Sequence, residues 1–182
     1  GNRRIMYDEK ELIRECICGN RLAEKQLYEQ YSARFFGICL RYAESREEAE
    51  DLLVSGFTLI FKHLSEFRAD GSFEGWMKRI IINHAIDGVR SRHTLEIQPM
   101  EGLQMAEEQS EERILQRIDA RQVMAAIRQL PPVLRTVFNL HAIEGYAHKE
   151  IARRLGIKES SARAYLSKAK DILQKTLTEF AS

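Results

Sequence analysis

The sequence predicts an all-α fold in which two helical domains are joined by a flexible acidic linker. Apolar residues recur at three- and four-residue spacing along most of the 182 residues, and no segment alternates as a strand would. Only three prolines interrupt this pattern. The stretch 93–112 differs: it holds six glutamates, no Lys or Arg and no firm periodicity, and therefore indicates a linker.

The segments on either side of this linker differ in charge. Residues 1–92 hold 15 Lys/Arg and 15 Asp/Glu, whereas residues 113–182 hold 13 and six, a difference that the whole-chain charge of +1 conceals. A basic module suits a nucleic-acid backbone, because neutralising phosphates releases counterions. We predict a neutral N-terminal domain at 1–92, a linker at 93–112 and a basic C-terminal domain at 113–182.

The N-terminal half predicts four helices. Apolar spacing over residues 8–42 indicates two helices with a break near Gly19. Ser45 opens an S-x-x-E capping box, so a third helix should begin there. The glycine-containing segment 67–73, "FRADGSF", ends that helix, and a fourth occupies roughly 73–92.

The C-terminal half predicts a helix-turn-helix. Helical spacing resumes at Ile114, and Pro131-Pro132 ends one helix and begins a second, which closes at Gly145. The stretch 148–170, "HKEIARRLGIKESSARAYLSKAK", then reads as two helices around a left-handed turn at Gly156, followed by an amphipathic tail.

The second helix of this motif divides into two faces. Three small or apolar residues should be buried: Ala162, Leu166 and Ala169. Six residues should lie on or near the outer face: Arg163, Ala164, Tyr165, Ser167, Lys168 and Lys170. Arg, Lys and Ser on that face suit base edges and phosphates in a major groove, although an ordinary hairpin with a solvated basic face has the same pattern. Neither helix starts at a good N-cap, because Ala147 and Lys158 stand there.

A second cluster interleaves aromatic and basic residues over 67–92. Its aromatics are Phe67, Phe73 and Trp76, and its cations are Arg68, Lys78, Arg79, Arg90 and Arg92. Aromatic rings beside cations can stack on unpaired bases while the cations hold the backbone. The alternative is that Trp76 and the Ile80-Ile81-Ile82 run are core and the charges are solvated.

Three motifs in this order carry a family resemblance: "AEDLL", "SFEGWMKRIIINHAID" and "LPPVLRTVFNL", the last followed by "EIARRLGI". From about residue 20 to 175 the chain resembles bacterial RNA polymerase sigma factors of the extracytoplasmic-function (ECF) group, in the sigma-70 family. The resemblance implies a cytoplasmic factor that binds core RNA polymerase and directs promoter-specific initiation. It also implies an N-terminal domain that melts and reads the −10 element and a C-terminal domain that reads the −35 duplex.

The resemblance further implies which residues do this. Residues matching the surface that binds the β′ clamp helices are Asp51, Leu52, Phe57 and Phe61. Those expected at the melted −10 strand are Phe67, Arg68, Phe73, Trp76, Arg79 and Asn83. Those expected at the −35 duplex are Lys158, Ser160, Ser161, Arg163, Ala164, Tyr165, Ser167 and Lys168. The polymerase β flap and an anti-sigma factor are the other implied partners.

Three positions depart from the family pattern. Val54-Ser55 stand where Gln-Glu is usual, which removes a carboxylate from the clamp-binding helix. Ala162 replaces a common valine, and Tyr165 stands where an arginine is often found. The resemblance therefore implies that one phosphate or base contact becomes stacking or an apolar contact with a thymine methyl.

Other classes of function lack support in the sequence. The five histidines are scattered, the cysteines have no zinc-ligand spacing, and there is no P-loop, H-E-x-x-H or G-x-S-x-G motif, so we expect no enzyme, metal or cofactor. No apolar run approaches the about 18 residues of a membrane span, so we expect no membrane insertion. The remaining alternative is a conventional helix-turn-helix regulator that acts without being a polymerase subunit.

Overall fold

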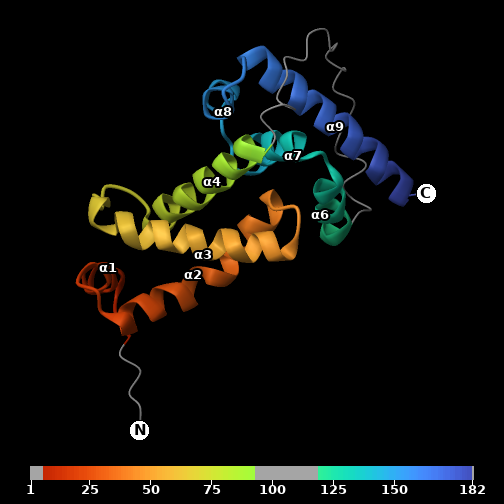
Figure 1. Ribbon diagram of the computed structural model, residues 1–182. Coiled ribbons are helices and arrows are strands. Elements are labelled where there is room, and N and C mark those ends of the chain that lie inside the picture. The colour runs from red at the N-terminus through yellow and green to blue at the C-terminus, as the bar shows by residue number, and fades with distance from the viewer. Residues whose placement is uncertain (1–5, 93–118, 182) are drawn as a thin grey trace. The chain divides into compact units, whose positions relative to one another are not determined.

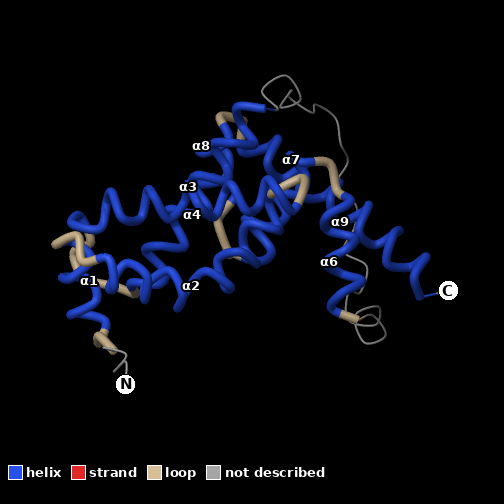
Figure 2. Tube along the Cα trace, turned by 60° about the horizontal axis from the view of Figure 1, so that its bottom comes forward, coloured by secondary structure: helices blue, strands red, loops and turns tan. Residues whose placement is uncertain are grey.

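Helices make up all the regular structure of the described residues, which are 6–92 and 119–181 of the computed structural model (Figures 1 and 2). The all-α prediction is therefore confirmed over these ranges. The chain divides into two compact units, residues 1–85 and 86–182, and each is described by itself. The expected linker at 93–112 lies outside the described residues. No helix in these ranges is both long and apolar enough to cross a bilayer.

The predicted break near Gly19 is confirmed as the corner between α1 (Glu9–Ile17) and α2 (Arg21–Tyr42). Gly19 has a φ of 79°, a left-handed backbone conformation that residues other than glycine seldom adopt. Asn20 then caps α2 by accepting hydrogen bonds from two N–H groups of its first turn.

Helix α3 (Arg46–His63) begins where the S-x-x-E motif predicts, and a 3₁₀ turn (Leu64–Glu66) follows it. The Ser45 hydroxyl accepts a hydrogen bond from the Glu48 N–H at 3.1 Å. The Glu48 carboxylate accepts from the N–H of Glu44, at 2.7 Å. Helix α4 (Phe73–Arg92) comes after the predicted loop.

The first unit has an aromatic and aliphatic core between α2, α3 and the first part of α4. The rings of Phe35 and Phe57 lie with centroids 5.8 Å apart. A Cβ on Gly56 would stand 2.5 Å from Cδ1 of Ile81, so α3 and α4 approach closely at this glycine. Cys39 is also buried here, and burial raises the pKa of its thiol to about 12, which keeps it protonated.

The second unit contains α6 (Ala120–Gln129), α7 (Pro132–Phe138), α8 (His148–Leu155) and α9 (Glu159–Ala181). The proline pair separates α6 from α7 as predicted. The expected single helix up to Gly145 is instead an α-helix that widens into a π-helix at Asn139–Ile143, where the Glu144 N–H donates to the Asn139 carbonyl five residues back.

The helix-turn-helix itself is α8 and the start of α9. Gly156 makes the turn with a φ of 68°, and α8 starts at Ala147 without a side-chain cap, both as predicted. The two helices share a core that includes Ile151, Leu155 and Ala162. The amphipathic tail is not separate, because α9 continues through it as one helix.

Candidate nucleic-acid interfaces

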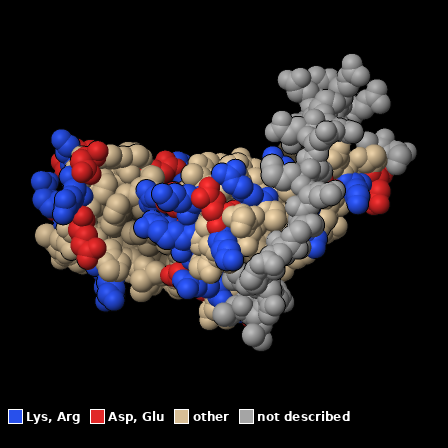
Figure 3. All heavy atoms as spheres, turned by 90° about the horizontal axis from the view of Figure 1, so that it is seen from above, with Lys and Arg blue, Asp and Glu red and all other residues tan. Residues whose placement is uncertain are grey.

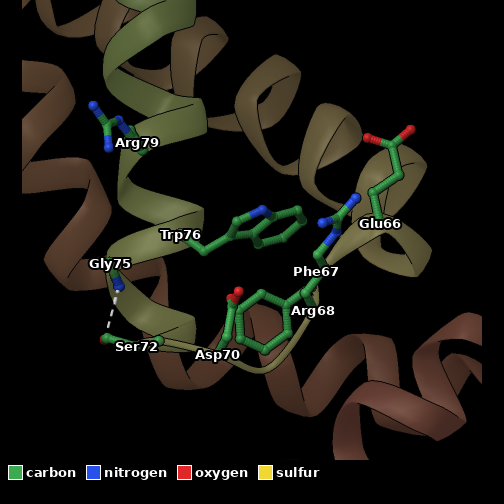
Figure 4. A pocket seen from close by; sticks show the side chains of 9 residues that line it. Glu66, Phe67, Arg68, Asp70, Ser72, Gly75, Trp76 and Arg79 are labelled. Carbon is green, nitrogen blue, oxygen red and sulfur yellow. Dashed lines mark hydrogen bonds between the residues drawn. The ribbon is translucent and has the colours of Figure 1, made fainter.

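The first unit holds a cavity of about 510 Å³ at the loop between α3 and α4. Its lining is Glu66, Phe67, Arg68, Asp70, Gly71, Ser72, Gly75, Trp76 and Arg79. Figure 4 shows the Phe67 and Trp76 rings close together, with Arg79 farther along α4. The structure thus brings together four of the six residues expected at the −10 strand.

Three rings pack at this site, and they differ in exposure. The Phe67 centroid lies 5.2 Å from that of Phe73 and 5.4 Å from that of Trp76. Phe67 and Trp76 are half-buried and line the cavity, whereas Phe73 is 1% exposed. Phe73 is therefore a core residue, and its expected place at the −10 strand is not matched by an exposed ring. Trp76, for which a core position was the alternative, keeps part of its surface in the cavity.

The backbone of the loop is held in a defined shape. Ala69 has a φ of 56°, a left-handed conformation that costs a non-glycine residue free energy and so needs support from its surroundings. Ser72 supplies support at the other end: its hydroxyl accepts from the Gly75 N–H at 3.1 Å, and its carbonyl accepts from the Trp76 N–H at 3.0 Å. The loop therefore enters α4 through a serine cap.

Both signs of charge surround the cavity. Arg68, Asp70 and Arg79 are exposed, so the cations can reach a phosphate and the carboxylate can accept from a base amino group. Asn83, the sixth expected residue, is half-buried one turn beyond Arg79 and does not line the cavity. Its Oδ1 is buried without a hydrogen-bond partner among the described residues.

Sequence reasoning missed three polar residues of this site: Glu66, Asp70 and Ser72. The serine had a usable signal, since it directly precedes the apolar start of a helix and stands three residues before Gly75. The two carboxylates had none, because exposed acids in a loop are usually only solvated.

The surface of α3 carries the residues expected to bind polymerase. Asp51 is exposed, and Leu52 and Phe61 are half-buried. Phe57 is only 3% exposed and packs its ring on those of Tyr28 and Phe61, at 4.9 and 6.2 Å. Phe57 therefore lies in the core in this structure and not on the surface of α3, where the resemblance places it.

The two residues of the unusual Val54-Ser55 pair have different surroundings. Val54 is exposed on α3. Ser55 Oγ lies 2.7 Å from His84 Nε2 of α4 and 2.8 Å from the Asp51 carbonyl oxygen. Where the family usually has a carboxylate, this chain has a hydroxyl that connects two helices.

In the second unit, the first turns of α9 present a mostly polar face. Lys158, Ser160, Arg163 and Lys168 are exposed, and Ala164 and Ser167 are half-buried. All six of these expected residues therefore keep at least part of their surface exposed.

Two other expected residues of the helix-turn-helix are buried. Ser161 and Tyr165 are each 4% exposed, so the expectation that Tyr165 lies on the outer face is wrong. Tyr165 is three residues after Ala162 and four before Ala169, and therefore shares their buried stripe. Burial also raises the pKa of the Tyr165 hydroxyl.

Acidic side chains accompany the basic ones. On the face drawn in Figure 3, most groups of Lys and Arg have Asp or Glu beside them. At the start of α9, Arg163 Nη2 donates to Glu159 Oε1 at 2.9 Å. On α8, Arg154 and Glu150 form a looser pair at 3.8 Å.

Two histidines stack beside this face. The rings of His141 and His148 have centroids 4.3 Å apart and planes within 13° of parallel. His141 Nδ1 lies 2.9 Å from the Tyr146 carbonyl oxygen. Burial, then His141 and then Arg163 lower the pKa of His148, so it is neutral at neutral pH.

The chain matches two families that describe parts of one kind of protein. Residues 27–94 match Sigma-70 region 2, and residues 120–173 match Sigma-70, region 4. The cavity lies within the first match, and both helices of the helix-turn-helix motif begin within the second.

Curated relatives and a solved structure agree with these matches. The chain is 29% identical to the ECF RNA polymerase sigma factor SigE of Mycolicibacterium smegmatis over 162 residues, which are 86% of this chain and 62% of that relative. It is 27% identical to the RNA polymerase sigma-H factor of Pseudomonas aeruginosa, over 93% of both chains.

The sigma factor RpoE of Bartonella quintana, solved in complex with the anti-sigma factor NepR, has a similar fold. The TM-score is 0.52 at 18% identity, and the match covers 85% of this chain and 96% of that one. The two regional matches and the two curated relatives, rather than this likeness of fold, show that the chain belongs to the RNA polymerase sigma factors of the ECF group, in the sigma-70 family.

Proposed function

We propose that this sigma factor binds core RNA polymerase and directs initiation at promoters with two elements, using the cavity on unpaired −10 DNA and α9 on the −35 duplex. One observation carries the proposal: the same chain joins an aromatic-walled cavity in its region 2 match to an exposed basic helix in its region 4 match. The corresponding division is residues 1–92, an acidic linker at 93–112 and residues 113–182.

In the −10 domain, an extruded base would enter the cavity and stack on Phe67 or Trp76. Extruding a base costs a few kcal/mol, and stacking on an aromatic ring returns about 1–3 kcal/mol per base. Arg68 and Arg79 would hold the strand's phosphates, and Asn83 would meet a neighbouring nucleotide. Phe73 would act indirectly, by supporting the two lining rings from the core.

In the −35 domain, the first turns of α9 would enter the major groove. Arg163 suits guanine, because its fork of N–H donors matches the O6 and N7 acceptors. Ser160, Ala164 and Ser167 would meet base edges, and Lys158 and Lys168 would neutralise phosphates. The buried residues Ser161 and Tyr165 have no part in this contact.

The polymerase contact would use the exposed side of α3. Asp51, Leu52 and Phe61 would meet the β′ clamp helices, with Phe57 supporting Phe61 from the core. The β flap would be a second contact on core polymerase. Val54, exposed on the same helix, would add an apolar contact where the family usually has a glutamine.

The proposal also covers regulation and location. Because RpoE of Bartonella quintana was solved with an anti-sigma factor, a protein of that kind is the expected inhibitor here. The protein would act in the cytoplasm, as a polymerase subunit that carries out no reaction of its own.

A run-off transcription assay tests the proposal against the helix-turn-helix regulator that acts alone. Core RNA polymerase with this protein should initiate at host promoters that core enzyme does not open. Asn83→Ala should reduce the promoter melting that permanganate detects and leave closed-complex binding intact. Arg163→Ala should instead weaken binding of the holoenzyme to the closed, unmelted promoter. A failure to produce a transcript from any host promoter, with DNA binding retained, would favour the regulator.

A further inference from the structure

We infer that Glu159 is a positioning residue for promoter selectivity: it holds the Arg163 guanidinium for a guanine in the −35 duplex and keeps it from settling on a phosphate. The inference rests on the proposed −35 role of α9. The inference assigns a role at a DNA-binding surface to an acidic residue, a type that is not expected there because DNA phosphates are negatively charged.

The geometry places the two side chains together at the start of α9. They are one helical turn apart, and Arg163 Nη2 donates to Glu159 Oε1 at 2.9 Å. Their side chains remain 52% and 47% exposed, so the pair is open to solvent and available to DNA. Because exposed pairs of this kind contribute little to stability, the main consequence of this pair is expected in binding.

The chemistry of arginine allows it to keep this partner while it reads a base. The guanidinium has five N–H donors, and one bond to Glu159 leaves enough of them for a bidentate contact to guanine O6 and N7. A side chain that is already restrained loses less conformational entropy on binding. The Glu159 carboxylate also repels phosphates, which weakens contacts that carry no sequence information.

The chain offers a matched control on α8. Glu150 and Arg154 have the same spacing and residue types, and their closest approach is 3.8 Å. Glu150→Gln removes the same charge from the same unit as Glu159→Gln. An effect of net charge alone would therefore appear equally in both variants.

The test uses the full-length protein in holoenzyme. A pool of random duplexes first defines the preferred −35 sequence, and duplexes with the guanine replaced then measure discrimination. Glu159→Gln should lower guanine discrimination by about fivefold or more, within the range of one good bidentate contact, and should raise affinity for unrelated duplex. Glu150→Gln should leave discrimination unchanged.

A double-mutant cycle completes the test. In an Arg163→Ala background, Glu159→Gln should change discrimination no further, because the carboxylate acts through the arginine. Unchanged discrimination in Glu159→Gln alone, or an undiminished further loss in the Arg163→Ala background, would overturn the inference. A wild-type holoenzyme without any −35 sequence preference would instead overturn the proposed role of α9 itself.

Discussion

The two proposed DNA sites, the cavity of the first unit and the exposed face of α9's first turns (Ser160, Arg163 and Lys168; below, the reading face), differ in their chemistry. The cavity is concave and walled by Phe67 and Trp76, whereas the first turns of α9 present polar and basic side chains and bury Tyr165. An unpaired base offers its flat faces to an aromatic ring, but a base in a duplex offers only its edges. The shape and composition of each site therefore suit the part of a base that we propose it contacts.

The two sites also differ in how they depend on the hydrophobic core. Phe73 joins the cavity to the interior, since its ring contacts Phe67 on one side and Tyr31 on the other, with centroids 5.2 and 6.3 Å away. The charged side chains of the reading face, Arg163 and Lys168, are instead exposed to solvent. Mutations at the cavity should therefore change both stability and DNA binding, whereas mutations on the reading face of α9 should change DNA binding alone.

The largest expected effect is that of Phe73→Ala. Removing a buried phenyl group costs about 3–5 kcal/mol, and the cavity wall loses its support. Urea unfolding followed by far-UV circular dichroism, which reports the helices of both units, should show this loss. Arg163→Ala, on the exposed face of α9, should change the free energy of unfolding by no more than about 0.5 kcal/mol. Similar stability losses in the two variants would remove the distinction between the sites.

A smaller effect should separate the sites by salt dependence. Trp76→Ala should cost about 1–3 kcal/mol in binding to a single-stranded −10 oligonucleotide and leave the salt slope unchanged, because stacking releases no counterions. Arg68→Ala, at the same cavity, is the control and should reduce the slope by about one if it contacts a phosphate. Fluorescence anisotropy over a salt series measures both. A reduced slope in Trp76→Ala would mean that its role is not stacking.

Local signals were enough to predict the helices and the turns between them. The Gly19 corner, the Ser45 cap, the proline pair and the Gly156 turn all depend on the backbone preferences of one or two residues, and each appears where expected. The π-helix after α7 could not be predicted, since the residues Asn139–Ile143 continue an ordinary helical pattern.

The candidate sites were predicted by residue type better than by orientation. Phe57, Phe73 and Tyr165 were each placed on a surface, and each is buried. Large aromatic residues are compatible with both environments, so only the packing of neighbouring helices decides between them. For Tyr165 the three- and four-residue spacing to Ala162 and Ala169 is that of the buried stripe, and grouping it with its polar neighbours on the outer face was wrong.

The smallest expected effect is a pH dependence of stability that arises from histidines. The residues lining the cavity include no histidine, whereas the second unit holds the stacked pair His141 and His148. His148 has its pKa lowered from 6.5 by burial, His141, Arg163 and Lys170, with Glu159 opposing. It is also the first residue of α8, where the helix dipole disfavours a cation. The unfolded chain therefore binds the proton more readily than the folded one.

The sign of the pH dependence follows from that difference. Since the unfolded state holds more protons between the lowered pKa and 6.5, the stability of this unit should fall as the pH drops below 6.5. Hydrogen exchange at amides of α8 and α9 measures the fall, and His148→Gln should flatten it. His63→Gln is the control, because His63 is in the first unit beside Glu66, at 3.1 Å. If His148→Gln keeps the full pH slope, the stacked pair does not sense pH, and the reading face differs from the cavity in shape and charge alone.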